Sequence, residues 1–209
     1  MEEITLGYAA LGASAVAVRS SATTEDCPGH SFAGQYDSFL GITSPLACVE
    51  AVKRCWASLW ARRAFEYREQ RGIDHRVARM AVVVQAMVDA ETSGVLFTAD
   101  PVTGRRDSVL IEACFGLGEV LVSGKVTPDR FVVVKECWDV AERVIGDKHI
   151  ECCPSEDGGV IEREIAGPRR KTACLEEKSA RALAALAVRA ETLLGAPQDI
   201  EWAVREGNL

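Results

Sequence analysis

Arginine, serine and threonine residues gather near the start of the chain in a pattern that suits phosphate. Arg19 ends an apolar run and is followed by Ser20, Ser21, Ala22 and two threonines. A guanidinium binds phosphate oxygens through two parallel hydrogen bonds, and neighbouring hydroxyls add further donors. An arginine in a salt bridge beside a self-capping polar loop fits these residues equally well, so the segment alone does not decide between the two interpretations.

A loop of small residues lies a few positions further on. Between Ser31 and Tyr36, Gly34 is followed by Gln35. Because glycine has no side chain, backbone N–H groups near it can approach a phosphate closely and form a concave anion nest. One glycine is a weak signal, and an ordinary turn is the favoured interpretation when this loop is considered by itself.

Two carboxylates near the end of the chain, Asp199 and Glu201, are separated by one residue. Residues two apart on a strand face the same side, so both could bind one hard cation. Mg²⁺ is commonly held by one or two carboxylates together with substrate phosphates. The alternative is a solvated edge strand. The apolar neighbours Ile200 and Trp202 argue for partial burial, and a partly buried carboxylate pair needs a cation nearby.

A valine-rich predicted strand ends in residues that could border an adenine ring. Gln85, Met87 and Val88 leave this strand, where backbone N–H and C=O groups can face a base edge and Met87 can pack on the ring. Considered alone, the segment is more typical of an ordinary strand end. Glu112, which with Glu119 flanks a Gly-Leu-Gly triplet, could contact a ribose or a second metal ion, or be an ordinary loop carboxylate.

Other catalytic and nucleotide-binding patterns are missing from the sequence. It contains no G-x-G-x-x-G after a strand and no G-x-x-x-x-G-K-[ST] motif. None of the three histidines occurs in a context typical of a base or a nucleophile, and no Ser/His/Asp or Cys/His order stands out. We therefore expect any catalysis to consist of positioning and charge neutralisation of a phosphoryl group.

Periodicity and turn residues predict the elements that position these side chains. A helix begins at 44–45 and runs to about Arg71, and its apolar and aromatic stripe is interpreted as core packing. The valine run 82–84 suggests a sheet covered on both faces. The other predicted elements are strands 16–20, 80–88, 94–98, 108–113, 130–135 and 199–204, helix 175–194, an irregular stretch 21–41 and a surface loop 152–159. This order predicts a mixed α+β domain.

Composition is ordinary for a globular protein of 209 residues, with 48% apolar and 26% charged residues. The formal net charge of −7 disfavours nucleic acid and anionic membranes as partners. No apolar run approaches the ~20 residues of a membrane span. Eight cysteines without a C-x-x-C pair, and an acidic N-terminus, predict a cytoplasmic protein with free thiols. The basic clusters 62–63 and 169–171 are interpreted as solvated surface.

Taken together, the motifs resemble one protein family over nearly the whole chain, from about Val16 to Val204. The resemblance is to the N-terminal ATP-binding domain of phosphoenolpyruvate synthase and pyruvate phosphate dikinase. The matching segments, in chain order, are 19–23 with 25–26, 31–35, 84–88, 93–98, 100–104, 112–119 and 199–202. Their number and their order make chance a poor explanation.

The resemblance implies an ATP-grasp-like fold with a mixed sheet and flanking helices, in which Mg-ATP lies between two subdomains. ATP would phosphorylate a histidine on a separate swivelling domain, which carries the group to pyruvate. By position, the resemblance implies that Arg19, with Ser20 beside it, contacts the phosphates and takes part in catalysis, and that Gly34 and Gln35 close over them. It implies that Gln85, Met87 and Val88 border the adenine and that Glu112 makes a further nucleotide contact. Asp199 and Glu201 would bind Mg²⁺.

Relative to that family, residues 1–209 are expected to form a partial domain. Met1 comes after the family's glycine- and lysine-bearing segment, and Leu209 comes before the glutamine and arginine that complete the metal and phosphate site. The swivelling histidine domain and the pyruvate domain are expected to lie outside residues 1–209. Two alternatives stay open: the ATP-binding domain of a rifampin phosphotransferase-like antibiotic kinase, and a non-catalytic fragment that only binds nucleotide. Apolar surface exposed by missing segments makes a homodimer a further expectation.

Overall fold

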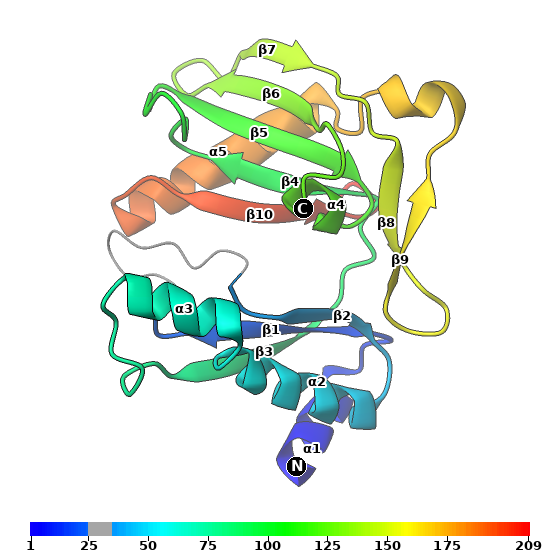
Figure 1. Cartoon of the computed structure of the whole chain (residues 1–209). Coiled ribbons are helices and arrows are strands. Elements are labelled where there is room, and N and C mark those ends of the chain that lie inside the picture. Colours follow the sequence, from blue (N-terminus) through cyan, green and yellow to red (C-terminus); the bar gives the residue numbers. More distant parts are fainter. Residues whose placement is uncertain (25–34) are drawn as a thin grey trace. The chain divides into compact units, whose positions relative to one another are not determined.

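The computed structural model describes residues 1–24 and 35–209, which form two compact units (Figure 1). Unit 1 comprises Met1–Met87 and Pro154–Val160, and unit 2 comprises Val88–Cys153 and Ile161–Leu209. Each unit combines helices with a sheet, so the predicted α+β class is confirmed. Among the described residues, no helix has both the length and the apolar character that crossing a membrane requires.

Unit 1 is built on the three-stranded sheet β2-β1-β3, and α2 packs against one of its faces. Its elements are α1 (Glu2–Leu11), β1 (Val16–Ala22), β2 (Ser38–Ile42), α2 (Pro45–Ser58), α3 (Arg62–Gln70) and β3 (Met80–Ala86). Val16 and Val18 of β1 meet Val52 of α2 in the core. The predicted start of α2 is confirmed, because Ser44 Oγ caps it by accepting the Ala47 N–H at 3.2 Å. The sequence patterns did not indicate α1 or β2.

The prediction of a single helix through position 71 is wrong, because the helix breaks after Ser58. The hydroxyl of Ser58 donates to a carbonyl of the preceding turn at 2.7 Å, a bond that bends helices. Ala61 then takes an extended ψ of 147° before α3 begins. The Leu59 carbonyl, which the break releases, accepts a hydrogen bond at 2.6 Å from the fully buried Arg68. The buried guanidinium therefore stabilises the bend between α2 and α3.

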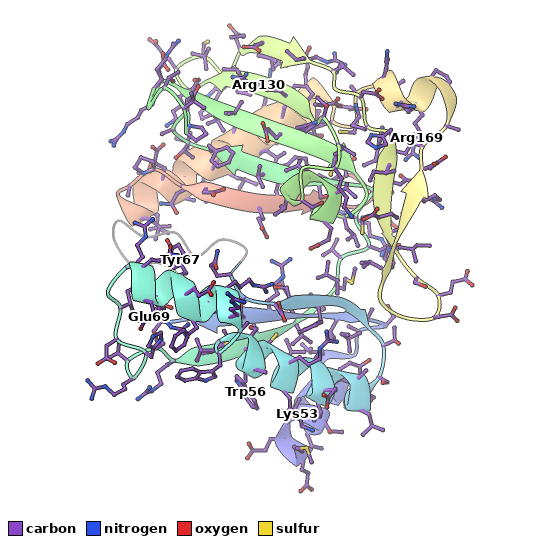
Figure 2. The ribbon with its side chains drawn as sticks, in the orientation of Figure 1. Lys53, Trp56, Tyr67, Glu69, Arg130 and Arg169 are labelled. Atoms are coloured by element: carbon purple, nitrogen blue, oxygen red, sulfur yellow. The ribbon has the colours of Figure 1, made fainter. Side chains whose placement is uncertain are left out.

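The aromatic stripe of this region belongs only partly to the core. Val52 is buried, whereas Trp56 and Trp60 expose 47% and 57% of their surface. The buried side of α2 is centred on Cys48, Val52 and Cys55, which leaves Trp56 at its edge (Figure 2). The prediction of core packing is therefore wrong for the two tryptophans.

Unit 2 is built on the five-stranded sheet β10-β4-β5-β6-β7, with α5 across one face (Figure 1). Its strands and helices are β4 (Thr92–Phe97), β5 (Ser108–Phe115), α4 (Glu119–Val122), β6 (Asp129–Val134), β7 (Val140–Val144), the 3₁₀ turn η1 (Gly167–Lys171), α5 (Glu177–Leu194) and β10 (Asp199–Val204). Leu96, Ile111 and Phe131 pack against Leu183 of α5 and Trp202 of β10. This cluster fixes the face on which each strand residue lies.

All paired strands of the two sheets run antiparallel, so the expected mixed sheet is wrong. Strands β4, β5, β6 and β7 are consecutive strands of the chain and also neighbours in the sheet, an order that antiparallel pairing allows without a crossover. Burial on both faces, expected for 82–84, is found instead in β5, where Leu110 and Ile111 are both buried. Val83 of β3 is 47% exposed, because only Val82 and Val84 face the core of unit 1.

The predicted surface loop 152–159 begins too early, because residues 152–154 belong to β8 (Ile150–Pro154); its end is correct, since residues 155–159 form the turn of a hairpin that continues into β9 (Val160–Glu164). The Leu117 N–H donates to the Cys152 carbonyl at 2.8 Å. Next to it, Gly116 has a φ of +70°, and a Cβ there would lie 2.2 Å from the Cys152 carbonyl oxygen. The polar sequence of this segment predicted a loop, whereas residues 152–154 are paired in β8 and Cys152 is buried.

A buried ion pair between Asp129 and Lys148 joins three parts of unit 2, and both side chains are fully buried. Asp129 also accepts the Gly146 N–H at 2.9 Å and the Cys174 N–H at 2.8 Å, while Lys148 donates to the Gly146 carbonyl at 3.1 Å. These bonds connect β6 to the segment between β7 and the β8–β9 hairpin and to the residues that lead into α5. Such a network stabilises the fold only while all its members are present.

We expect Lys148→Met to lower the free energy of unfolding by about 3–5 kcal/mol, because it leaves Asp129 buried without its cation. Urea unfolding followed by circular dichroism measures the change. The control is Lys125→Met, whose partner is Glu162 and whose side chain is half exposed, and a much smaller effect is expected there. Equal losses in the two variants would contradict a special role for the buried pair.

Candidate functional site

Arg19 and Gln85 lie on the same face of the unit 1 sheet. Ala17 pairs directly with Gln85, and Arg19 pairs directly with Val83. Directly opposite residues of an antiparallel pair point to one side, and side chains alternate along each strand. Because Val16 and Val18 face α2, Arg19 and Gln85 are diagonal neighbours on the other face, where both are exposed. The structure thus brings together a predicted phosphate contact and a predicted adenine contact.

Ser20 lies on the opposite face from Arg19, so its hydroxyl is not part of the same group. It pairs with Val82, which packs against the core beneath α2. The hydroxyl-rich sequence suggested that the strand ends at Ser20, whereas β1 continues to Ala22 and keeps its alternation. Ser21, one of the neighbouring hydroxyls but without an assigned role, is exposed on the Arg19 face.

Gln35 is described, while the predicted phosphate-closing Gly34 lies outside the described residues. The Gln35 carbonyl accepts a hydrogen bond from Arg63 Nε at 2.8 Å, and Arg63 also forms an ion pair with Asp37. Arg63 was interpreted as solvated surface; its side chain is half exposed, and it also connects Gln35 to α3. The role of Gln35 in closing over phosphates stays a prediction.

Met87 and Val88 mark the first point where the chain passes from unit 1 to unit 2. The Met87 N–H donates to the Ala15 carbonyl at 3.0 Å, and its Sδ accepts the Gly41 N–H at 3.1 Å. The Met87 N–H is therefore already used within unit 1 and is not available as a donor to a base edge. Val88 is 48% exposed, and its carbonyl accepts the Ala90 N–H at 3.0 Å.

Asp199 and Glu201 lie on one face of the unit 2 sheet, opposite the face covered by α5. Both residues are exposed on an edge strand, so the expected partial burial of the pair is wrong. Ile200 and Trp202, which alternate with them, pack toward α5. Glu201 pairs directly with Val95 of β4, and Val95 pairs directly with Glu112 of β5. Glu112 therefore shares the face of the two carboxylates, one strand further in. The register brings three predicted site residues onto one surface.

The electrostatics of the Asp199 and Glu201 pair suit a cation. Partial loss of hydration raises the pKa of Asp199 above its usual value although the residue is exposed, and the negative charge of Glu201 raises that pKa further. A divalent cation would relieve both effects, since it compensates the desolvated charge and the repulsion. No group of three or more His, Cys, Asp or Glu among residues 1–24 and 35–209 is placed to hold a metal ion. Two carboxylates with phosphate oxygens are nevertheless a sufficient set for Mg²⁺.

Arg130 on β6 is a polar residue of this face that sequence reasoning missed (Figure 2). It pairs directly with Glu112, and its Nε is buried without a hydrogen-bond partner in the described part of the chain. Backbone N–H groups of Thr103 and Val102 lower the pKa of Asp100, and the Arg130 charge adds to this lowering. In the sequence Arg130 is one polar residue in a strand, and only the β5–β6 register shows that it faces Glu112.

The comparisons with known proteins agree on one family. A family model described as "Pyruvate phosphate dikinase, AMP/ATP-binding domain" matches residues 1–209. A probable phosphoenolpyruvate synthase of Methanothermobacter thermautotrophicus is 46% identical over 194 residues, which are 93% of this chain and 28% of that protein. The phosphoenolpyruvate synthase of Pyrococcus furiosus is 44% identical over 194 residues, with 90% and 24% covered.

A rifampicin phosphotransferase of Streptomyces sviceus is 49% identical over 188 residues, which are 90% of this chain and 21% of that protein. The chain thus spans between 21% and 28% of the length of these relatives, all of which are named as phosphotransferases or phosphoenolpyruvate synthases. Because the family model matches the whole of residues 1–209, this chain belongs to the pyruvate phosphate dikinase AMP/ATP-binding domain family.

Proposed function

We propose that the chain is the ATP-binding part of a phosphoenolpyruvate synthase. In this proposal, Mg-ATP phosphorylates a histidine on a separate swivelling domain, and the group then passes to pyruvate. The observation that carries the proposal is the Asp199 and Glu201 pair, two carboxylates on one face of β10 with the pKa of Asp199 raised. Such a pair can bind a cation, and in an ATP-binding family that cation would be the Mg²⁺ that accompanies the nucleotide phosphates.

Each predicted site residue has a role in this proposal. Asp199 and Glu201 hold Mg²⁺, which when bound neutralises charge on the phosphate oxygens. The Arg19 guanidinium binds the transferred phosphate as a bidentate donor, and Gly34 with Gln35 closes over it. The Gln85 side chain, on the Arg19 face, borders the adenine together with Met87 and Val88. Glu112, on the face of the metal carboxylates, contacts the nucleotide beyond the metal.

A rifampicin phosphotransferase is the second candidate, because the identity to the Streptomyces sviceus enzyme is 49%. Both candidates need the same Mg-ATP chemistry from this part of the chain, and they differ in the group that accepts the phosphate. A full-length protein that consumes ATP with pyruvate and not with rifampicin supports the synthase. The reverse preference would establish the antibiotic kinase and overturn the first proposal.

We expect Glu201→Gln to weaken the Mg²⁺-dependent binding of ATP by about 10- to 100-fold, because it removes one charged ligand of the cation. Isothermal titration calorimetry with ATP, with and without Mg²⁺, measures the effect. The matched control is Glu142→Gln on β7, an exposed carboxylate on the far edge of the same sheet. An unchanged Mg²⁺ dependence in Glu201→Gln, or an equal loss in the control, would refute the metal assignment.

Arg19→Ala is expected to lower ATP affinity by about 10- to 100-fold, since a charge-assisted bond to phosphate is lost. The control is Arg62→Ala, which removes an arginine that is paired with Glu66 and highly exposed on α3. Calorimetry with adenosine gives a second comparison, because that ligand has no phosphate. If adenosine binding falls as much as ATP binding, Arg19 does not act on the phosphates.

Asp199→Asn is expected to change the pH dependence of stability of the Mg²⁺-free chain. The raised pKa means that the folded state favours the protonated carboxyl, so the stability from Asp199 is fully present below its ordinary pKa of 3.8 and is lost as pH rises through the raised pKa. The neutral asparagine avoids this loss. Thermal melts in EDTA should therefore favour the variant more at pH 7 than at pH 3.5, and a pH-independent difference between the two proteins would contradict the assignment.

A further inference from the structure

The turn of the β8–β9 hairpin packs tightly against the end of β2 within unit 1. The Gly159 N–H donates to the Gly41 carbonyl at 2.7 Å, and the turn is closed by the Ser155 N–H on the Gly159 carbonyl at 3.0 Å. Gly41 has a φ of +69°, and a Cβ there would lie 2.1 Å from the Gly159 carbonyl oxygen. Position 41 therefore needs glycine both for its backbone conformation and for the close approach of the turn.

The second polar group of Gly41 is directed to Met87. The Gly41 N–H donates to Met87 Sδ at 3.1 Å, while the Met87 N–H donates to the Ala15 carbonyl at 3.0 Å. Backbone and side chain of Met87 are thus each fixed by a separate hydrogen bond. A chain of contacts runs from Gly159 through Gly41 to the thioether sulfur, and all its members belong to unit 1.

A fixed methionine is unusual, because its unbranched side chain has three rotatable bonds and normally adapts to its surroundings. A sulfur that accepts an N–H from one side leaves its methylene and methyl groups free to contact an apolar ring on another side. Met87 is only partly buried, so part of this side chain stays accessible. The contact with Gly41 therefore selects one side-chain position before a ligand arrives, which reduces the entropy lost on binding.

We propose that the turn 155–159, acting through Gly41, positions the Met87 side chain against the adenine ring of the bound nucleotide. This inference rests on the proposed function, in which Met87 borders the adenine. Gly41 and Gly159 are then positioning residues, because they touch Met87 or its support rather than the ligand. Loss of the turn contact weakens binding of the base and leaves the binding of the phosphates unchanged.

The test compares Gly41→Ala with Gly72→Ala, using Mg-ATP and Mg-tripolyphosphate as probes in calorimetry. Gly72 also has a positive φ, +65°, but a Cβ there meets nothing within 4 Å, so this control carries the backbone strain without displacing the turn. Gly41→Ala is expected to lower Mg-ATP affinity by about three- to tenfold, the worth of a sulfur–aromatic contact, with no loss for Mg-tripolyphosphate. Gly72→Ala is expected to change neither.

Met87→Leu conserves volume and fold, so it keeps the proposal testable even if Gly41→Ala does not fold. It should lower Mg-ATP affinity by a similar factor, spare Mg-tripolyphosphate, and speed hydrogen exchange of the Gly41 amide. In the double variant the two losses should not add, because both act on the same contact. Additive losses, or equal losses for both probes, would overturn the inference. A wild-type chain that binds neither probe would instead overturn the proposed function on which it rests.

Discussion

The like charges of Asp199 and Glu201 are held on an edge strand that the rest of unit 2 keeps in register. Ile200 and Trp202, which alternate with the carboxylates, pack into the core beneath α5 and prevent a slip by one residue. At the start of the strand, the Thr98 N–H donates to the Gln198 carbonyl at 2.9 Å, and the Thr98 hydroxyl accepts the Gln198 N–H at 2.7 Å. Burial of the apolar side chains thus keeps two repelling carboxylates on one surface.

The same alternation separates what the sequence could predict from what it could not. The shared side of Asp199 and Glu201 follows from their spacing alone, because the period of a strand is two. The position of Glu112 on the same face of the sheet depends on the β10–β4–β5 register, which no local sequence pattern encodes. Arg130 was missed for this reason. The prediction that Ser20 shares a site with Arg19 was wrong because the hydroxyl-rich sequence suggested that β1 ends at Ser20, whereas the strand continues to Ala22.

Elements that depend on distant partners were the hardest to predict. The bend after Ser58 is stabilised by Arg68, a residue whose burial beneath Leu59 has no signature in its own helix. The β8–β9 hairpin has a polar sequence and is held by backbone contacts at Gly116 and Gly41, far away in the chain. By contrast, the fold class and the start of α2 follow from periodicity and from a capping serine, which are local signals.

The two units are interleaved along the sequence, since unit 1 takes residues 154–160 from between two stretches of unit 2. The chain therefore passes between them at 87–88, at 153–154 and again at 160–161. Neither unit can be excised as one uninterrupted piece, because residues 1–87 alone would leave the Gly41 carbonyl without the Gly159 N–H. Recombination between relatives must therefore exchange both units together. A chimera joined only at 87–88 would combine Gly41 from one parent with the turn 155–159 from the other.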